Sequence, residues 1–263
     1  MKTVIVIPAR YASSRFEGKP LAEITGATGI KKSLIQRTWE AAMQVPGIAQ
    51  VIVATDDHRI AEHAEKFGAV VIMTSSTARN GTERCAEALE HLPDDIDVVV
   101  NFQGDAPLTP PGFVTDIVAA MGLNGASMAT PVLRCDTQTL ARFREDRRAG
   151  RVGGTTAVFD KSHRALYFSK EIIPYSDQLT SPPLPVFHHV GLYAFRPAAL
   201  RQYSAWPEGE LERVEGLEQL RFLENGATIQ CVEVSAKGRV FWEVNNPVDI
   251  ARVETALAKM GIE

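Results

Sequence analysis

The feature that most constrains this chain is a run of four β-branched residues, Val4-Ile5-Val6-Ile7, followed at once by a proline and a cationic loop. Such a run predicts a short strand that is buried on both faces, as in a parallel sheet. Pro8 should end the ladder of this strand, because it has no N–H to donate. Open α/β sheets bind their ligands where the strands end, so the loop after this strand is a candidate binding loop.

That loop, residues 9–19, combines small residues with fixed positive charge and is called the cationic loop below. Small side chains let backbone N–H groups approach a ligand, and guanidinium and ammonium groups attract a polyanion. We interpret the loop as a triphosphate site, although a solvated surface loop would explain the cations alone. Its cations are Arg10, Arg15 and Lys19, and its small residues are Ala9, Ala12, Ser13, Ser14 and Gly18.

Composition narrows the class of protein. A length of 263 residues suits one α/β domain, and a net charge of −4 without a basic block argues against a nucleic-acid partner. No apolar run reaches the length of a membrane span, and the chain enters a strand at once instead of a signal peptide. The three cysteines are far apart and lack metal-site spacing. We therefore expect a reduced, cytoplasmic protein with no membrane contact.

Segments typical of strands and helices alternate through the first half, which predicts an open, largely parallel sheet. The predicted strands there are 51–56, 70–74 and 98–102, and the predicted helices are 31–45, 60–67 and 82–91. The second half is less regular, and a charged run at 142–151 is interpreted as a solvated connection. The strands predicted in the second half are 128–133, 155–159, 164–169, 188–195 and 229–234, and the helices are 211–224 and 248–260.

Asp105 is the sharpest single candidate. It follows a predicted buried strand and a glycine, so its carboxylate should lie at the edge of the sheet beside the cationic loop. A carboxylate facing a triphosphate requires a cation between them, and Mg²⁺ prefers hard oxygen ligands. An aspartate that only caps a turn is the simpler explanation of an isolated Gly-Asp pair.

Residues 7–21 resemble the opening signature of the 3-deoxy-manno-octulosonate (Kdo) cytidylyltransferases, and the likeness continues to residue 258. It implies a Rossmann-like nucleotidyltransferase fold with a mostly parallel mixed sheet and a smaller lobe. Within a single domain, 1–263, residues 1–125 would be the nucleotide-binding half, 126–240 the lobe for sugar and dimer contacts, and 241–263 a metal-ligand loop with a final helix. One departure is Glu17, where the family usually has proline, which should soften the loop and place an anion near the phosphates.

The same resemblance implies an activity. CTP and Kdo would give CMP-Kdo and pyrophosphate, the activation step for bacterial lipopolysaccharide, in a cytoplasmic homodimer that uses Mg²⁺. Arg10, Arg15, Lys19 and Asp105 would carry the catalysis, with Asp105 and Asn245 as metal ligands. The nucleotide would contact Pro8, Ala9, Arg10, Lys19, Ser75, Asn80, Gly81 and Gln103.

The acidic sugar would be held by Gln103 and by residues of the second half, namely Lys170, His189, Tyr193, Glu215 and Gln219. His189, Gly191 and Tyr193 alternate along one predicted strand and should share a face. Glu215 and Gln219 are one helical turn apart and should do the same. Ordinary packing explains both sets equally well without the resemblance, and helix capping does so for Asn80.

Several positions depart from the family pattern. Ala106 replaces a glutamate, Lys170 an arginine and Thr156 a lysine. Asn245 replaces the aspartate that is the second metal ligand, which keeps an oxygen ligand but loses a charge. Asp249 is a candidate to compensate, although an acid also suits the start of a helix.

Three alternatives stay open at this point. A cytidylyltransferase for another acidic sugar, such as 8-amino-Kdo, would keep the first-half motifs and change the second half. The protein could instead be a non-catalytic nucleotide-binding relative, in which case Asn245 would mark the loss of a metal ligand that the protein no longer needs. A nicotinamide-dependent dehydrogenase is disfavoured, because no GxGxxG follows the first strand.

Overall fold

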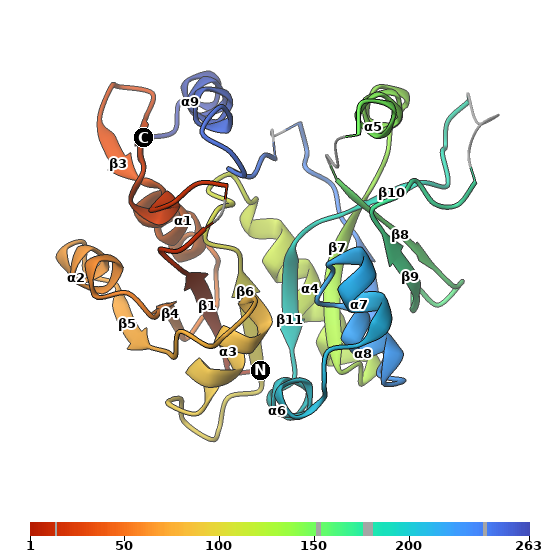
Figure 1. Cartoon of the computed structure of the whole chain (residues 1–263), viewed down its shortest axis with the longest axis horizontal. Helices are drawn as coiled ribbons and strands as arrows, with labels where there is room; N and C mark the ends of the chain where they lie inside the picture. Colours follow the sequence, from red (N-terminus) through yellow and green to blue (C-terminus); the bar gives the residue numbers. More distant parts are fainter. Residues whose placement is uncertain (14, 151–153, 176–180, 239–240) are drawn as a thin grey trace. The chain divides into compact units, whose positions relative to one another are not determined.

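The computed structural model describes residues 1–13, 15–150, 154–175, 181–238 and 241–263 (Figure 1). Ser14 of the cationic loop and Arg151 of the charged run lie outside the described residues. The chain forms two compact units, residues 1–115 with 236–263 (unit 1) and residues 116–235 (unit 2). Each unit is described by itself.

Unit 1 contains a parallel sheet in the order β5-β4-β1-β6, as the buried apolar runs predict. These strands are β1 (Thr3–Ala9), β4 (Gln50–Thr55), β5 (Val70–Met73) and β6 (Val98–Phe102). A separate antiparallel hairpin joins β2 (Glu23–Thr25) to β3 (Lys31–Ser33). The β-branched side chains of β1 and β6 are fully buried, which is why these two segments form central strands.

Helices of unit 1 connect and cover these strands. They are η1 (Lys19–Leu21), α1 (Leu34–Met43), α2 (His58–Lys66), α3 (Gly81–Leu89) and α9 (Asp249–Met260), and the chain passes into unit 2 within α4 (Pro111–Asn124). Ser33, Asp57 and Asn80 cap α1, α2 and α3 by accepting a backbone N–H with their side chains. The caps at Asp57 and Asn80 end the loops that follow β4 and β5, so these two loops are anchored on both sides.

The first strand extends beyond the predicted end at Ile7. Its pairing with β4 continues through Pro8 to Ala9, whereas its pairing with β6 stops at Val6. A proline lacks an N–H on only one edge of a strand, so the ladder on the other edge can continue past it. The prediction that Pro8 ends the strand was therefore wrong for the β4 side.

Unit 2 is built on β7 (Met128–Arg134), which pairs with three strands. It has β12 (Ile229–Glu233) parallel on one edge, and β10 (Phe187–His189) and β11 (Leu192–Phe195) antiparallel on the other. Further antiparallel pairs join β10 to β8 (Thr155–Phe159) and β8 to β9 (Ala165–Ser169). The helices are α5 (Thr137–Arg148), α6 (Pro197–Ala205), α7 (Glu210–Glu215) and α8 (Leu220–Glu224).

Three predictions for the second half need correction. The strand 188–195 is broken after His189 by a tight turn in which Leu192 N–H donates to the Val190 carbonyl. The helix 211–224 is two helices, because Gly216 takes a left-handed conformation (φ 62°) and ends α7. The charged run 142–151 lies largely in α5, which buries only Leu140 and Phe143. Helices α4 and α6 were not predicted, and among the described helices none is long and apolar enough to cross a membrane.

Candidate functional site

Lys19 and Asp105 meet at the carboxyl edge of the sheet in unit 1. The Lys19 Nζ atom lies 2.6 Å from Asp105 Oδ2 and also donates to the Val244 carbonyl at 3.1 Å. Both charged side chains are largely buried. The cationic loop and the Gly-Asp turn, 86 residues apart in sequence, are therefore joined by a direct ion pair. Arg10 and Arg15 of the same loop are exposed.

Gly104 explains how the turn comes so close to the loop. A Cβ atom at this position would lie 2.6 Å from the Pro8 carbonyl oxygen, so no side chain fits there. The Gly104 carbonyl accepts a hydrogen bond from Thr38 Oγ1 at 3.1 Å, which ties the turn to α1. The ends of β1 and β6 are thus held against each other with Asp105 at the edge.

Two of the predicted nucleotide contacts lie at the start of α3. Asn80 caps this helix by accepting the Glu83 N–H at 2.8 Å, and Gly81 is its first residue. A Cβ on Gly81 would lie 3.3 Å from Pro8 Cγ and 3.4 Å from Gln103 Nε2. The structure therefore brings Pro8, Gly81 and Gln103 together. Ser75 is exposed, and its N–H and hydroxyl are bonded to Glu87.

Asn101 and Arg84 are polar residues of this region that the predicted contacts omitted. Asn101 is fully buried on β6, and neither its amide nitrogen nor its amide oxygen has a hydrogen-bond partner within the described part of the chain. Arg84 is also buried and pairs with Asp56 at 3.4 Å. Burial lowers the pKa of Arg84, opposed by Asp56, and the charge of Arg10 lowers it further. Asn101 is recognised as a candidate by its buried polar atoms, which have no partner in the described part of the chain. The sequence alone does not show whether such atoms have partners.

A second acid stands near Asp105. Glu243 precedes Val244, whose N–H donates to the Asp105 carbonyl at 2.8 Å. Burial, and after it the Asp105 charge, raise the pKa of Glu243 to about 7, although Lys19 and a hydrogen bond from the Asn245 side chain oppose the shift. No motif of the sequence marks Glu243, because it lies 138 residues from Asp105 and in an irregular segment.

Asp249 is already engaged within its own segment. Its carboxylate accepts the backbone N–H groups of Asn245 and Asn246 at 3.0 and 2.8 Å, and the Trp242 indole N–H at 3.2 Å. It is buried as the first residue of α9. This carboxylate shapes the loop that presents Asn245, which is the helix-start role that an acid favours.

Among the described residues, no group of three or more histidine, cysteine, aspartate or glutamate side chains is placed to hold a metal ion by itself. Magnesium commonly binds through one or two carboxylates and completes its shell with phosphate oxygens and water. Asp105, Glu243 and the Asn245 amide oxygen suit such a partial shell. The mutual repulsion that raises the pKa of Glu243 is the kind that a divalent cation relieves.

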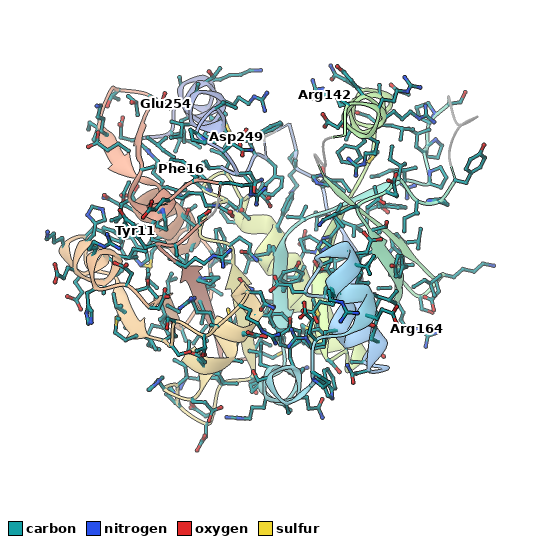
Figure 2. All side chains as sticks on the ribbon, in the orientation of Figure 1. Tyr11, Phe16, Arg142, Arg164, Asp249 and Glu254 are labelled. Atoms are coloured by element: carbon teal, nitrogen blue, oxygen red, sulfur yellow. The ribbon has the colours of Figure 1, made fainter. Side chains whose placement is uncertain are left out.

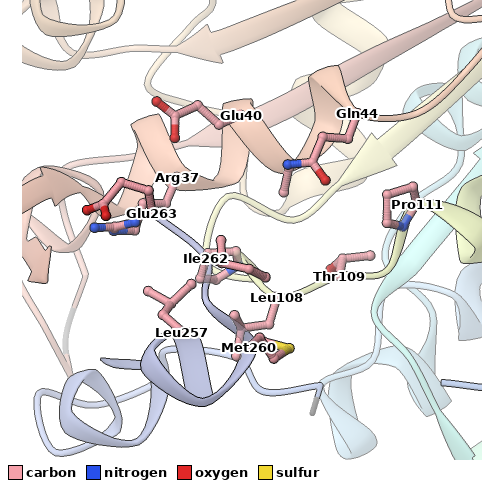
Figure 3. Close-up of a pocket in the computed structure, with 12 residues that line it drawn as sticks. Arg37, Glu40, Gln44, Leu108, Thr109, Pro111, Leu257, Met260, Ile262 and Glu263 are labelled. Atoms are coloured by element: carbon pink, nitrogen blue, oxygen red, sulfur yellow. The ribbon is translucent and has the colours of Figure 1, made fainter. Parts of the chain in front are cut away.

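Figure 3 shows a pocket of unit 1 that α1, the segment after the Asp105 turn and the C-terminal residues line. It has a volume of about 50 Å³, and none of the predicted site residues lines it. Arg37 reaches it from α1, with its guanidinium bonded to the Ile24 and Ile30 carbonyls and its Nη1 atom unpaired within the described ranges. The space suits one or two water molecules.

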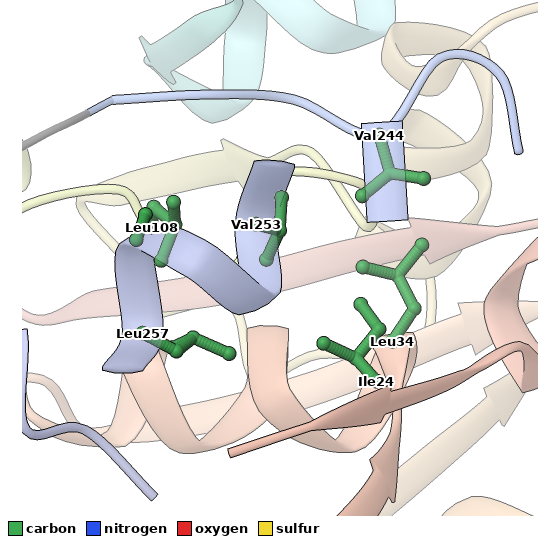
Figure 4. Close-up of a cluster of buried hydrophobic side chains, with 7 residues drawn as sticks. Ile24, Leu34, Leu108, Val244, Val253 and Leu257 are labelled. Atoms are coloured by element: carbon green, nitrogen blue, oxygen red, sulfur yellow. The ribbon is translucent and has the colours of Figure 1, made fainter. Parts of the chain in front are cut away.

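A buried cluster behind the Asp105 turn fixes the segment that carries Glu243 and Asn245. Val244 packs with Ile24, Leu34 and Leu108, and with side chains of α9 (Figure 4). Val244 is fully buried, so its neighbours in sequence are held at the surface of this cluster. Apolar packing therefore helps to fix the position of the loop, together with its hydrogen bonds to Asp249.

In unit 2, three of the predicted sugar contacts lie close together and are buried. The His189 and Tyr193 rings have centroids 5.6 Å apart, although the strand between them is broken. The Tyr193 hydroxyl donates to Gln219 Oε1 at 3.3 Å. The Gln219 Nε2 atom is buried and has no partner in the part of the chain that the structure describes. This unpaired donor is the feature of the group best suited to a ligand oxygen.

Glu215 does not share a helical face with Gln219, because Gly216 separates the two helices. Its carboxylate accepts from the Ser169 hydroxyl at 2.7 Å and from the Lys170 N–H at 2.9 Å. Lys170 Nζ lies 2.9 Å from the place where a Cβ on Gly216 would be. Glu215 thus fixes the end of β9 and, with it, Lys170.

Buried histidines in unit 2 should make the protein sensitive to acid. Burial lowers the pKa of His189 to about 3 and that of His188 to about 4. Each folded pKa lies below the ordinary value, so the stabilisation is complete above pH 6.5 and is lost as the pH falls toward 3. For His189 alone the loss should be on the order of 2–4 kcal/mol. The free energy of urea unfolding, measured from pH 7.5 to 4, should fall less steeply in His189→Gln than in the parent or in the exposed-site control His91→Gln. Equal slopes would contradict the assignment.

Comparison with known proteins shows the class of enzyme to which the chain belongs. Residues 4–229 match the family model described as Cytidylyltransferase, so the chain is a nucleotidyltransferase. A solved structure titled as CMP:2-keto-3-deoxy-manno-octonic acid synthetase complexed with CTP has a TM-score of 0.84 and 34% identity, and covers 99% of this chain and 100% of that one. The fold is accordingly the Rossmann-like nucleotidyltransferase fold that the resemblance implied.

Curated relatives narrow the class to one family. The 3-deoxy-manno-octulosonate cytidylyltransferase of Maricaulis maris is 42% identical over 262 residues, which are 99% of each chain. The enzyme of the same description from Chlamydia trachomatis is 40% identical and covers 97% of this chain and 94% of its own length. A relative from Arabidopsis thaliana that is described as mitochondrial is 41% identical, over 97% of this chain and 83% of its own. The chain belongs to the 3-deoxy-manno-octulosonate cytidylyltransferase family.

Proposed function

We propose that this enzyme couples CTP to Kdo and releases pyrophosphate. The main support for this proposal is the Lys19–Asp105 ion pair at the carboxyl edge of a parallel sheet. The chain that contains this pair is 42% identical over its length to a 3-deoxy-manno-octulosonate cytidylyltransferase. The anomeric hydroxyl oxygen of the sugar forms a bond to the α-phosphorus of CTP. The α–β phosphoanhydride bond breaks, pyrophosphate leaves with the bonding pair, and the hydroxyl proton passes to solvent.

Charge and position carry most of the acceleration in such a transfer. Arg10 and Arg15 neutralise the triphosphate from the exposed side of the cationic loop, and Lys19 does so from its buried end. Pro8, Gly81 and Gln103 form the wall against which the nucleotide lies, next to the unpaired amide of Asn101.

Magnesium is the cation we propose for this site, with Asp105, Glu243 and Asn245 as the residues that hold it. When bound there, it would neutralise phosphate charge and act as a Lewis acid. The chain's own residues prepare that place: Lys19 keeps the Asp105 carboxylate turned toward the cationic loop, and Asp249 holds the loop of Asn245.

The acidic sugar is proposed to contact Gln219 Nε2, Lys170, His189 and Tyr193 in unit 2, with Glu215 as a positioning residue. We further propose a cytoplasmic homodimer, and the supporting observation is the family to which the chain belongs. Sedimentation of the purified enzyme measures the dimer.

Pyrophosphate release tests the function. The enzyme is incubated with Mg²⁺, one nucleoside triphosphate and one of a panel of sugars: Kdo, 8-amino-Kdo and other ulosonic acids. We expect release with CTP and Kdo, and at least ten times less with UTP or without sugar. Preference for another sugar acid would replace Kdo in the proposal, and binding of CTP without release under any condition would make the protein a non-catalytic relative.

The variant Asn245→Asp tests the metal loop. A full charge at this position strengthens the Coulomb attraction for a divalent cation, so the Mg²⁺ concentration for half-maximal rate should fall about three- to tenfold. Binding of Mn²⁺ in the presence of CTP, followed by electron paramagnetic resonance, should tighten in parallel. Asn246→Asp is the matched control because it adds the same charge one residue away. An identical response of both variants would remove Asn245 from the site.

A further inference from the structure

The cationic loop is fastened to α2 by an aromatic contact that the proposed chemistry does not use. The loop carries Tyr11, which is labelled in Figure 2. The Arg59 guanidinium carbon of α2 lies 3.3 Å from the centroid of the Tyr11 ring. This distance is well inside the range in which a cation is attracted to an aromatic face. The contact joins the loop after β1 to the helix after β4, two elements 48 residues apart.

Arg59 is itself held in place. Its Nε and Nη2 atoms donate to the two oxygens of the Asp57 carboxylate at 2.9 and 2.7 Å, and its backbone N–H donates to the same side chain at 2.9 Å. Asp57 is the residue that caps α2. A guanidinium with both ends of its fork bonded has little freedom left, so it presents one fixed face to the ring.

The Tyr11 ring also lies against Gly18, near the other end of the loop. A Cβ on Gly18 would meet the ring at 3.1 Å, and the backbone of Gly18 is left-handed, with φ 68°. The Gly18 N–H donates to the Tyr11 carbonyl at 2.9 Å. Residues 11 and 18 are therefore in contact through both ring and backbone, and Lys19 comes next.

Glu17 adds a negative charge next to Gly18 in the cationic loop. It is exposed, and its charge contributes to raising the pKa of Arg59, after the larger contribution of Asp57. The anion that Glu17 adds to the loop therefore lies near Arg59. That it softens the loop and lies near the phosphates stays a prediction.

We propose that Arg59, fixed by Asp57, clamps the Tyr11 ring against Gly18 and so holds Lys19 and the cationic loop in their binding position before the nucleotide arrives. Arg59 is a positioning residue in this proposal, which rests on the proposed function for its effect on CTP. A loop ordered in advance loses less conformational entropy on binding, so the clamp should lower the KM for CTP and leave kcat nearly unchanged.

The test uses the full-length enzyme and two readouts. In Arg59→Met, amide hydrogen exchange at Gly18 of the free protein should accelerate about fivefold or more, and the KM for CTP should rise by a similar factor. Tyr11→Leu should give the same changes, Tyr11→Phe should give nearly none, and Arg59→Lys should recover part of the loss. Arg142→Met, on an exposed arginine of α5, is the matched control.

A double-variant cycle makes the result specific to the contact. Arg59→Met combined with Tyr11→Leu should be no worse than either change alone. Additive effects, or unchanged exchange at Gly18 in Arg59→Met, would overturn the clamp. If exchange accelerates as expected while the parent enzyme releases no pyrophosphate from CTP with any sugar, the clamp stands and the proposed function fails.

Discussion

Asp105→Asn should lower kcat/KM for pyrophosphate release by about 10³-fold or more. The substitution keeps the size of the side chain and removes the charge that faces Lys19 at 2.6 Å and would hold the divalent cation. A cation that neutralises phosphate in the transition state contributes several kcal/mol, and each 1.4 kcal/mol is about a factor of ten in rate. Steady-state kinetics at saturating Mg²⁺ measure the loss.

The fold should survive that change, because the Asp105 backbone carbonyl keeps its bond from Val244 N–H and Gly104 keeps its contact with Pro8. Asp95→Asn, which removes an exposed acid paired with Lys2, is the matched control and should leave the kinetics unchanged. A residual activity within threefold of the parent would exclude Asp105 from the reaction.

Arg221→Met should lower the free energy of unfolding by about 3–5 kcal/mol, because it leaves a buried carboxylate without its partner. Arg221 is 1% exposed, donates to both oxygens of Glu212 at 2.6 and 2.7 Å, and stacks on the Tyr203 ring at 4.0 Å. The residue falls in the segment that resembles the family's sugar-binding helix, yet its contacts are internal to unit 2. Urea unfolding followed by circular dichroism measures the change.

Replacing both Arg221 and Glu212 shows whether the loss of stability comes from the unpaired carboxylate or from the lost packing of the guanidinium. Arg221→Met with Glu212→Leu removes the uncompensated charge and should recover most of the stability. Lys31→Met, which breaks the exposed pair with Glu23, should have a far smaller effect. If the double variant is as unstable as Arg221→Met, the loss comes from packing around the guanidinium and not from the stranded carboxylate.

The parallel sheet of unit 1 could be predicted from sequence because its strands are short, buried, β-branched runs between helical segments. The missed helix α4 has apolar residues on nearly all sides, so no helical period stands out in residues 111–124. The break in the strand 188–195 is set by its pairing with β7, since both halves bond to the same edge. Such a break depends on residues about 60 positions away and leaves no local signal.

The candidate site, like the fold, could be predicted from sequence only in part. Lys19 and Asp105 could be placed together because parallel strands end at one edge of a sheet, and this rule needs only the order of elements. Sequence reasoning did not identify three further residues, because each matters through a neighbour that is distant in sequence. These are Glu243 near Asp105, Asn101 near Gly81 and Arg59 on Tyr11, which are 138, 20 and 48 positions apart. Glu215 and Gln219 were placed on one face by helical spacing, and a single left-handed glycine between them made that placement wrong.

Gly104 has an implication for how this family member can evolve. With no space for even a methyl group beside the Pro8 carbonyl, the cationic loop and the Gly-Asp turn share one backbone junction. Any larger residue there would displace both segments at once. A substitution at Gly104 would therefore disturb Lys19 and Asp105 together, whereas a substitution that leaves this glycine in place can leave the junction unchanged.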